Sequence, residues 1–246
     1  MAVSRSKFSK VRTILKGAAK HAKALKMGVN RVYEDIMLAE SPIRSVGALD
    51  FLGENLQVTL HNFLSVDGNV TIDELVFICA LAQKTKPTRI VEIGTFDGNT
   101  ALQLALNTPT DARIYTLDLP IGTDGPTEVD YHDLKYIGSD RRINRRFLGT
   151  EVERKVKQLY GNSLTYDFSA FSVDGPPDFI FIDAGHSYEC VRNDTEKSLA
   201  ILRAGGVIVW QDYGTVWPGV YQYLVELSSR LPLVHIAGSS LVIYES

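Results

Sequence analysis

Three acidic residues and one histidine stand where predicted strands end, and their side chains have the strongest potential for chemistry. Asp118 and Asp183 each close an apolar strand, and His186 follows three residues after the second of them. Asp212 follows the next strand, so its carboxylate and that of Asp183 can approach one point if the two strands are neighbours. Two like charges there are unfavourable unless a proton or a cation is shared. One histidine with two aspartates favours Mg²⁺ over iron, and His186 adds a general base or a third ligand.

A glycine-containing turn occupies residues 89–104, R-I-V-E-I-G-T-F-D-G-N-T-A-L-Q-L. A short apolar run ends at Gly94, and after Gly98 the apolar residues recur at helical spacing, which predicts strand, tight turn and helix. Such a turn presents backbone N–H groups at a helix N-terminus, and Glu92 adds a fixed negative charge beside it. Dinucleotide sites have G-x-G-x-x-G, whereas this spacing is G-x-x-x-G. We therefore expect a ligand with a cationic portion rather than a diphosphate.

The elements that position these residues alternate between strand and helix, which predicts a parallel, doubly wound α/β sheet. A capping box, Thr71 with Glu74, starts one helix cleanly. Two short apolar runs flank A-G-S-S near the end of the chain, and this hairpin signal makes one strand antiparallel to the rest. The predicted strands are 90–93, 113–118, 156–160, 178–183, 206–210, 233–236 and 241–244, and a helix is predicted at 188–202.

Two stretches carry a resemblance to a known family. E-I-G-T-F-D-G-N-T is similar to the E-x-G-x-x-x-G of catechol O-methyltransferase-like enzymes, a branch of the class I S-adenosylmethionine-dependent methyltransferases. D-F-I-F-I-D-A-G-H-S-Y-E and L-R-A-G-G-V-I-V-W-Q-D-Y resemble the bacterial small-molecule O-methyltransferases (methyltransferase family 24, macrocin O-methyltransferase-like), which include macrolide-sugar enzymes. The chain departs from the family pattern at Gln211, where histidine is common, and at Tyr213, where catechol-type enzymes have asparagine.

The resemblance covers about residues 70–246 and implies a Rossmann-like sheet of seven strands in the order 3-2-1-4-5-7-6, with the last strand antiparallel. It implies transfer of a methyl group from S-adenosylmethionine to a hydroxyl of a small molecule or sugar. Asp183 and Asp212 would hold Mg²⁺, and His186 and Asp183 would be catalytic. Asp118 would accept the ribose hydroxyls of the donor. The other residues expected to contact the donor are Glu92, Gly94, Thr95, Gly98, Thr100, Asn162 and Ser163, with Asp167 and Phe168 as further candidates.

Other interpretations stay open. A non-catalytic nucleotide-binding or assembly subunit would keep the fold but need not keep the three metal-site residues together. Asp183 can instead cap the helix that follows it, and His186 can simply close the turn after a glycine. An iron oxygenase normally uses two histidines and one carboxylate, which this chain does not offer at these positions.

Residues 119–149 form a predicted irregular segment that is too long for an ordinary connection, so we expect a lid or substrate loop. The segment carries R-R-I-N-R-R, residues 141–146, whose four guanidiniums can hold an anionic group of the substrate or can simply be solvated. Tyr131, His132 and Tyr136 are candidates for a pocket wall.

The N-terminal part differs from the rest of the chain in charge. Residues 1–33 contain nine of the 26 Lys and Arg residues and none of the 29 Asp and Glu residues. Apolar residues from Phe8 to Leu25 recur every three or four positions, which predicts an amphipathic basic helix. Packing of its apolar stripe on the protein itself or on a second subunit is the favoured role, while peripheral membrane contact, nucleic-acid contact and a transit peptide stay open.

We expect residues 1–70 to form a basic helical extension and cap, and residues 71–246 to form the methyltransferase domain. No apolar run is long enough to span a membrane, and the two cysteines, Cys79 and Cys190, lack metal-type spacing. We therefore expect a cytoplasmic homo-oligomer with reduced thiols and a small-molecule acceptor, and no nucleic-acid partner.

Overall fold

The computed structural model describes residues 34, 36–53, 56–63, 66–123 and 125–246. The chain divides into two compact units, residues 1–41 and 42–246. In the first unit, residues 34 and 36–40 are helical, and the amphipathic helix predicted from Phe8 to Leu25 lies outside the described residues. Within the described ranges, no helix combines the length and the apolar character that crossing a membrane requires.

The centre of the second unit is a sheet of eight strands in the described part of the chain, in the order β1-β7-β8-β6-β5-β2-β3-β4. β8 runs antiparallel to both of its neighbours, and all the other pairs are parallel. The strands are β1 Arg44–Val46, β2 Arg89–Ile93, β3 Arg113–Asp118, β4 Val156–Tyr160, β5 Phe179–Ile182, β6 Val207–Trp210, β7 Val234–Ile236 and β8 Val242–Glu245.

The seven predicted strands all form, and their predicted order is confirmed together with the antiparallel last strand. β1 was not predicted, because the predicted strands begin at residue 90 and residues 1–70 are expected to form a helical extension and cap. β1 has three residues, which pair in parallel register with Val234, His235 and Ile236 at the sheet edge. So short a strand has no periodicity of its own, and its partner residues in β7 lie 190 positions away in the sequence.

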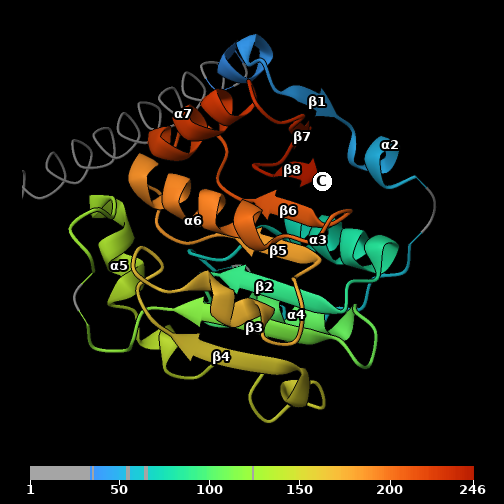
Figure 1. Cartoon of the computed structure of the whole chain (residues 1–246), viewed down its shortest axis with the longest axis vertical. Coiled ribbons are helices and arrows are strands. Elements are labelled where there is room, and N and C mark those ends of the chain that lie inside the picture. The colour runs from blue at the N-terminus through green and yellow to red at the C-terminus, as the bar shows by residue number, and fades with distance from the viewer. Residues whose placement is uncertain (1–33, 35, 54–55, 64–65, 124) are drawn as a thin grey trace, which may run out of the picture. The chain divides into compact units, whose positions relative to one another are not determined.

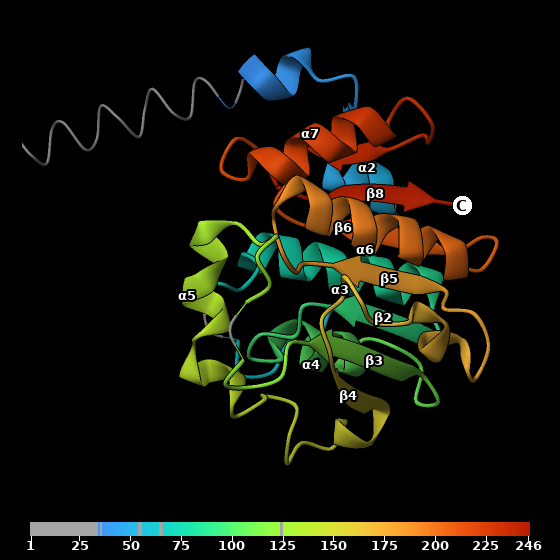
Figure 2. The same cartoon turned by 60° about the vertical axis from the view of Figure 1, so that its left-hand side comes forward.

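Helices cover both faces of the sheet (Figure 1), with α6 and α7 on one face and α3 and α4 on the other (Figure 2). The predicted capping box at the start of α3 is confirmed, since Thr71 and Glu74 exchange both of its hydrogen bonds. The helices are α2 Ala48–Leu52, α3 Ile72–Thr85, α4 Asn99–Leu106, α5 Leu134–Ile137, α6 Tyr188–Ile201 and α7 Pro218–Leu227.

The central strands β5 and β6 are buried along their whole length, as expected for parallel strands covered on both faces. Cys79 in α3 and Cys190 in α6 are buried and free. The strands β2, β3, β5 and β6 point their carboxyl ends at one edge of the sheet, and α5 lies beyond that edge (Figure 1).

Gly94 follows β2 at this edge with a φ of 98°. A Cβ atom on it would lie 1.8 Å from the carbonyl oxygen of Asp183, so no other residue can stand there without separating β2 from β5. The turn after β2 and the end of β5 are thus packed directly against each other.

Candidate active site

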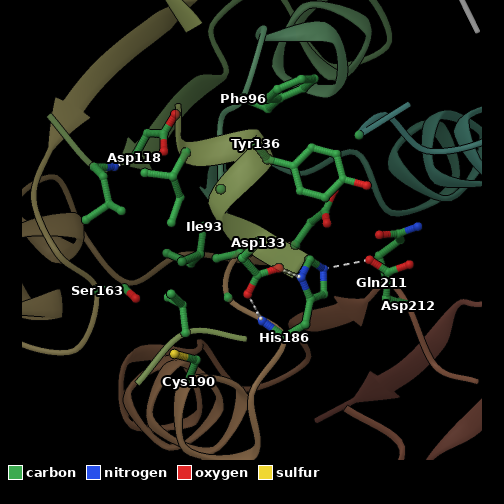
Figure 3. A pocket seen from close by; sticks show the side chains of 18 of the residues that line it. Ile93, Phe96, Asp118, Asp133, Tyr136, Ser163, His186, Cys190, Gln211 and Asp212 are labelled. Atoms are coloured by element: carbon green, nitrogen blue, oxygen red, sulfur yellow. Dashed lines mark hydrogen bonds and ion pairs between the residues drawn. The ribbon is translucent and has the colours of Figure 1, made fainter. Parts of the chain in front are cut away.

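A cavity of about 510 Å³ opens at the carboxyl edge of the sheet. Its walls come from the ends of β2, β3, β5 and β6, from the segment after β4, and from the irregular segment 119–149 (Figure 3). The position of that segment over the cavity agrees with its predicted role as a lid. The predicted site residues that line the cavity are Gly94, Asp118, Asn162, Ser163, Asp183, His186 and Asp212.

Asp183, His186 and Asp212 come together at one end of the cavity, where each offers a ligand atom and these atoms all lie within 4.8 Å of one another. The ends of β5 and β6 bring the two carboxylates together because these strands are neighbours. Asp212 has a φ of 67°, a left-handed conformation that is uncommon for a residue with a side chain and typical of functional sites.

The imidazole of His186 lies between two carboxylates (Figure 3). Its Nδ1 is 2.5 Å from Oδ1 of Asp133, and Oδ2 of the same residue accepts a hydrogen bond from the backbone N–H of His186 at 3.0 Å. Its Nε2 forms an ion-pair contact with Oδ2 of Asp212 at 2.7 Å. Trp217 stacks on the ring with 3.9 Å between centroids. Burial lowers the pKa of His186, but the two carboxylates outweigh it and raise the pKa to about 10.

The arrangement disfavours the charged form of the Asp183 carboxyl. Burial and the nearby carboxylate of Asp212 raise the pKa of Asp183 to about 8, while His186 lowers it. Within the described residues, neither Asp183 nor Asp212 forms an ion pair with a lysine or an arginine. Two carboxylates and one imidazole at the wall of a cavity fit a divalent cation by their donor chemistry.

Sequence reasoning missed Asp133 and Trp217. Asp133 is 4% exposed and lies in a short 3-10 helix, Tyr131–Asp133, within the irregular segment. Nothing in that segment's pattern distinguishes this acid from the others there, because its role depends on where the segment folds over the strand ends. Of the three candidates for a pocket wall, His132 and Tyr136 line the cavity, whereas Tyr131 is 80% exposed and does not.

At the other end of the cavity, two buried arginines bind the carboxylate of Asp118. Arg145 Nη2 donates to Oδ2 at 2.8 Å, and Arg142 donates to both oxygens at 3.2 and 3.3 Å. Arg146 pairs in the same way with the buried Asp97. The solvated-charge alternative predicted for the arginine run is therefore wrong for these three residues, while substrate binding by the run stays a prediction. The three arginines attach the lid to the strand end and the turn.

Glu92 does not reach the cavity. Its carboxyl is 1% exposed and accepts a hydrogen bond from Thr116, and its other oxygen has no partner. Burial raises the pKa of Glu92 to about 8, although the Thr116 hydroxyl lowers it in part, so the protonated form is favoured at neutral pH. The fixed negative charge expected beside the turn is absent.

Three further residues that were predicted to contact the methyl donor lie behind the cavity wall. Thr95 Oγ1 bonds to Thr116 and Gln158, Thr100 is buried in α4, and Gly98 is the N-cap of α4 with a φ of 77°. A Cβ on Gly98 would meet the Phe147 ring at 2.8 Å. These residues build the turn; of the first motif's predicted contacts, only Gly94 lines the cavity.

Asn162 and Ser163 follow β4 and line the cavity as part of a fixed loop. The Asn162 side-chain oxygen accepts from the backbone N–H of Leu164 at 3.0 Å, and the Ser163 hydroxyl donates to Asp194 of α6 at 3.1 Å. The further candidates Asp167 and Phe168 are not part of the wall. Asp167 is exposed and caps a 3-10 helix, and Phe168 is buried against Phe171.

The geometry agrees with the outcome of a comparison with known families, in which the model of a methyltransferase domain matches residues 91–213. The chain belongs to this methyltransferase family. The match begins in β2 and ends directly after Asp212, so it contains every strand end that forms the cavity. The resemblance that the two sequence motifs carry is confirmed.

Curated relatives and solved structures agree with this membership. A caffeoyl-CoA O-methyltransferase from Populus kitakamiensis is 26% identical over 175 residues, 71% of this chain and 67% of the relative. Tapetum-specific methyltransferase 1 from Arabidopsis thaliana is 25% identical over 74% of this chain and 70% of its own length. Among structures, a methyltransferase from Podospora anserina shares the fold with a TM-score of 0.52 and 19% identity, over 80% of this chain and 93% of the other.

Proposed function

We propose that this methyltransferase transfers a methyl group from S-adenosylmethionine to a hydroxyl of a small molecule, assisted by a divalent cation. The observation that carries the proposal is the cluster of Asp183, His186 and Asp212 at one end of a cavity whose other end is lined by Asp118. A non-catalytic subunit with this fold has no use for a buried Asp183 held against Asp212, an arrangement that raises the pKa of Asp183 and costs stability at neutral pH. The names of the relatives, which include O-methyltransferases, support a hydroxyl as the acceptor.

The reaction is a displacement at carbon. The oxygen of the acceptor hydroxyl attacks the methyl carbon of the sulfonium, the bond from that carbon to sulfur breaks, and S-adenosylhomocysteine and the hydroxyl proton leave. The donor is already activated by its own positive charge, so the protein's main tasks are to orient the two substrates and to remove the proton. The donor would lie over Gly94, Asp118 and Asn162, which line the cavity at the ends of β2, β3 and β4.

Asp183 and Asp212 would hold the cation, and His186 would be a third ligand or the proton acceptor once its imidazole has released the proton that the neighbouring carboxylates favour. A divalent cation bound there supplies Lewis-acid activation of the acceptor hydroxyl and lowers its pKa. Asp133 and Trp217 fix the imidazole plane from two sides, so His186 presents Nε2 to the cluster in one orientation. Such an oriented imidazole is the arrangement that a general base or a metal ligand requires.

The arginine run does not identify the acceptor. An anionic acceptor was one expectation from residues 141–146, but Arg142, Arg145 and Arg146 are already paired with acids of the protein. A sugar or a phenolic small molecule remains as the proposed acceptor class. One similar fold belongs to a TDP-rhamnose 3'-O-methyltransferase, at 17% identity and a TM-score of 0.51.

The cytoplasmic location, the homo-oligomer, and the division into an extension of residues 1–70 and a domain of residues 71–246 stay predictions. Two free, buried cysteines support a reducing compartment. The roles predicted for residues 1–33 lie outside the described residues.

The direct test uses S-adenosylmethionine with a deuterated methyl group and a panel of catechols, simple phenols and free sugars. Mass spectrometry is expected to find the labelled methyl on at least one acceptor with Mg²⁺ present, and much less of it with excess chelator. Calorimetry with S-adenosylhomocysteine gives a second readout that needs no acceptor. Absence of S-adenosylhomocysteine binding would contradict the proposed donor. Full activity in excess chelator would show that the reaction does not need a cation.

A further inference from the structure

Two sequence motifs meet at Asp212. One starts a helix, the other forms a hairpin turn, and neither has been given a further role so far. The first is the capping box of α3, Thr71 with Glu74. The second is the A-G-S-S turn between β7 and β8, which ends at Ser240. Glu74 and Ser240 are 166 residues apart in the sequence, yet their side chains are hydrogen-bonded. This contact lies directly under the backbone that carries the candidate metal ligand.

The backbone at Asp212 needs support. Its φ of 67° places a residue with a Cβ in the left-handed region, which is less stable than the ordinary regions unless the surroundings hold it. The conformation turns the chain sharply after β6, and the carboxylate then reaches the cluster with His186, 2.7 Å from its Nε2.

Ser240 holds both sides of this turn. Its side-chain hydroxyl accepts a hydrogen bond from the backbone N–H of Asp212 at 3.1 Å. Its backbone carbonyl accepts another from the N–H of Tyr213 at 2.9 Å. One serine therefore binds two successive amides, the one that carries the ligand and the one after it.

Glu74 in turn holds Ser240. Its Oε1 accepts from the backbone N–H of Ser240 at 2.8 Å and from the hydroxyl at 2.7 Å. Its Oε2 accepts from the backbone N–H and the hydroxyl of Thr71 at 3.0 and 2.9 Å. The Glu74 side chain is 4% exposed, so a buried carboxylate with four donors fixes the hydroxyl hydrogen of Ser240 toward itself and leaves the oxygen lone pairs for Asp212.

We propose that Ser240 and Glu74 are positioning residues for Asp212. They hold the left-handed backbone at this position and thereby direct its carboxylate toward Asp183 and His186. The proposal rests on the proposed function for the meaning of the cluster, while the backbone role itself is independent of any metal.

The first test measures Mn²⁺ binding to the full chain by electron paramagnetic resonance. Ser240→Ala keeps the backbone contacts and removes the hydroxyl, and we expect Mn²⁺ to bind about tenfold more weakly. Ser239→Ala is the matched control, because its hydroxyl contacts only Ile236 and Leu241 within the hairpin. Its affinity should equal that of the wild type.

Glu74 is tested against Thr71 in the same assay. Glu74→Ala and Thr71→Ala both break the capping box, but only Glu74→Ala releases Ser240. We expect weaker Mn²⁺ binding for Glu74→Ala alone. Equal affinities for Ser240→Ala and wild type, with binding lost in Asp212→Asn, would overturn the positioning role and leave the proposed function standing.

The second test needs no metal and decides the proposal even if the wild type binds no Mn²⁺, a result that would count against the proposed function instead. Asp212→Gly should melt about 2–4 °C above Asp212→Ala, because glycine tolerates the left-handed backbone and alanine does not. In the Ser240→Ala background the backbone can relax, so this gap should shrink by at least half, while the Ser239→Ala background keeps it. An unchanged gap in the Ser240→Ala background would overturn the proposal.

Discussion

The two ends of the cavity treat acidic side chains in opposite ways. At the donor end, formed by β2, β3 and β4, the Asp118 carboxylate is bound by Arg142 and Arg145, and Glu92 is buried against a hydroxyl. At the acceptor end, formed by β5 and β6, the carboxylates of Asp183 and Asp212 face each other with one imidazole beside them. Both ends belong to the same sheet edge, so the difference lies in the partners.

This difference indicates that the end with Asp118 is a structural framework and the end with Asp183 and Asp212 is a binding site. Paired and hydrogen-bonded charges stabilise the folded state, and breaking such a pair in the interior is strongly destabilising. Like charges held together destabilise it, and the fold keeps them only where a ligand or a reaction needs them. We infer that the Asp118 carboxylate at the donor end is paired within the protein, whereas the acceptor end is completed by a cation.

Removing one acid from the acceptor end should have the largest effect on methyl transfer. Asp183→Asn or Asp212→Asn is expected to lower turnover by about a hundredfold or more, because the cation is lost. Affinity for S-adenosylhomocysteine should change little, since the donor contacts lie at the other end. Steady-state kinetics and calorimetry measure the two quantities, with Asp111→Asn as a control on an exposed acid. Equal losses of turnover and donor affinity would contradict the separation.

Removing the acid of the donor end should instead affect stability. Asp118→Ala leaves two arginine side chains, 3% and 2% exposed, without their partner, and we expect it to lower the free energy of unfolding by about 3–5 kcal/mol. Denaturant unfolding checks this, with Asp140→Ala, an exposed acid of the same lid, as the control. A loss below about 1 kcal/mol would mean that the arginines do not hold the lid to β3.

The Glu92 carboxyl makes the stability of the folded protein depend on pH. Its pKa is about 8 in the folded protein against an ordinary value of 4.5, so the folded state keeps a proton that the unfolded chain releases. Its contribution to stability therefore falls as pH rises from about 4.5 to 8 and is constant above that range. Glu92→Gln removes this slope, and its melting temperature should gain on the wild type between pH 5 and 8, by the equivalent of about 1–3 kcal/mol. A pH-independent difference would show that Glu92 ionises normally.

The smallest effect is expected from residues outside both ends of the cavity. Deleting residues 1–33 should leave the cooperative melt within ~2 °C of the wild type, because the sheet and its helices all belong to the unit 42–246. Loss of the cooperative transition would make this segment part of the core or of an obligate interface.

The comparison also shows what the sequence can and cannot predict. The strand ends that carry Asp118, Asp183 and Asp212 were predictable because buried parallel strands are continuous apolar runs and their ends meet at one edge. The partners of the site residues were not predictable. Asp133, which contacts His186, and Arg145, which contacts Asp118, come from an irregular segment whose path depends on tertiary contacts.

Burial was equally hard to predict. Glu92 directly precedes Ile93 and the turn, and its sequence neighbours do not reveal that Thr116 closes over its carboxyl. The charge expected there is a property of the isolated residue, and the folded environment favours the neutral, protonated form instead. Strand β1 was missed for a related reason, because three residues gain their structure only from β7.

The measurement that tests the central claim most directly is thermal melting of the wild type, Asp183→Asn and Asp118→Asn, each in chelator and in excess Mg²⁺. We expect that in chelator Asp183→Asn melts above the wild type and Asp118→Asn below it, because the first substitution removes a buried acid whose raised pKa costs stability and the second breaks paired charges. Mg²⁺ should raise the melting temperature of the wild type and Asp118→Asn but not that of Asp183→Asn. A lower melting temperature for Asp183→Asn in chelator, with no effect of Mg²⁺ on the wild type, would contradict the central claim.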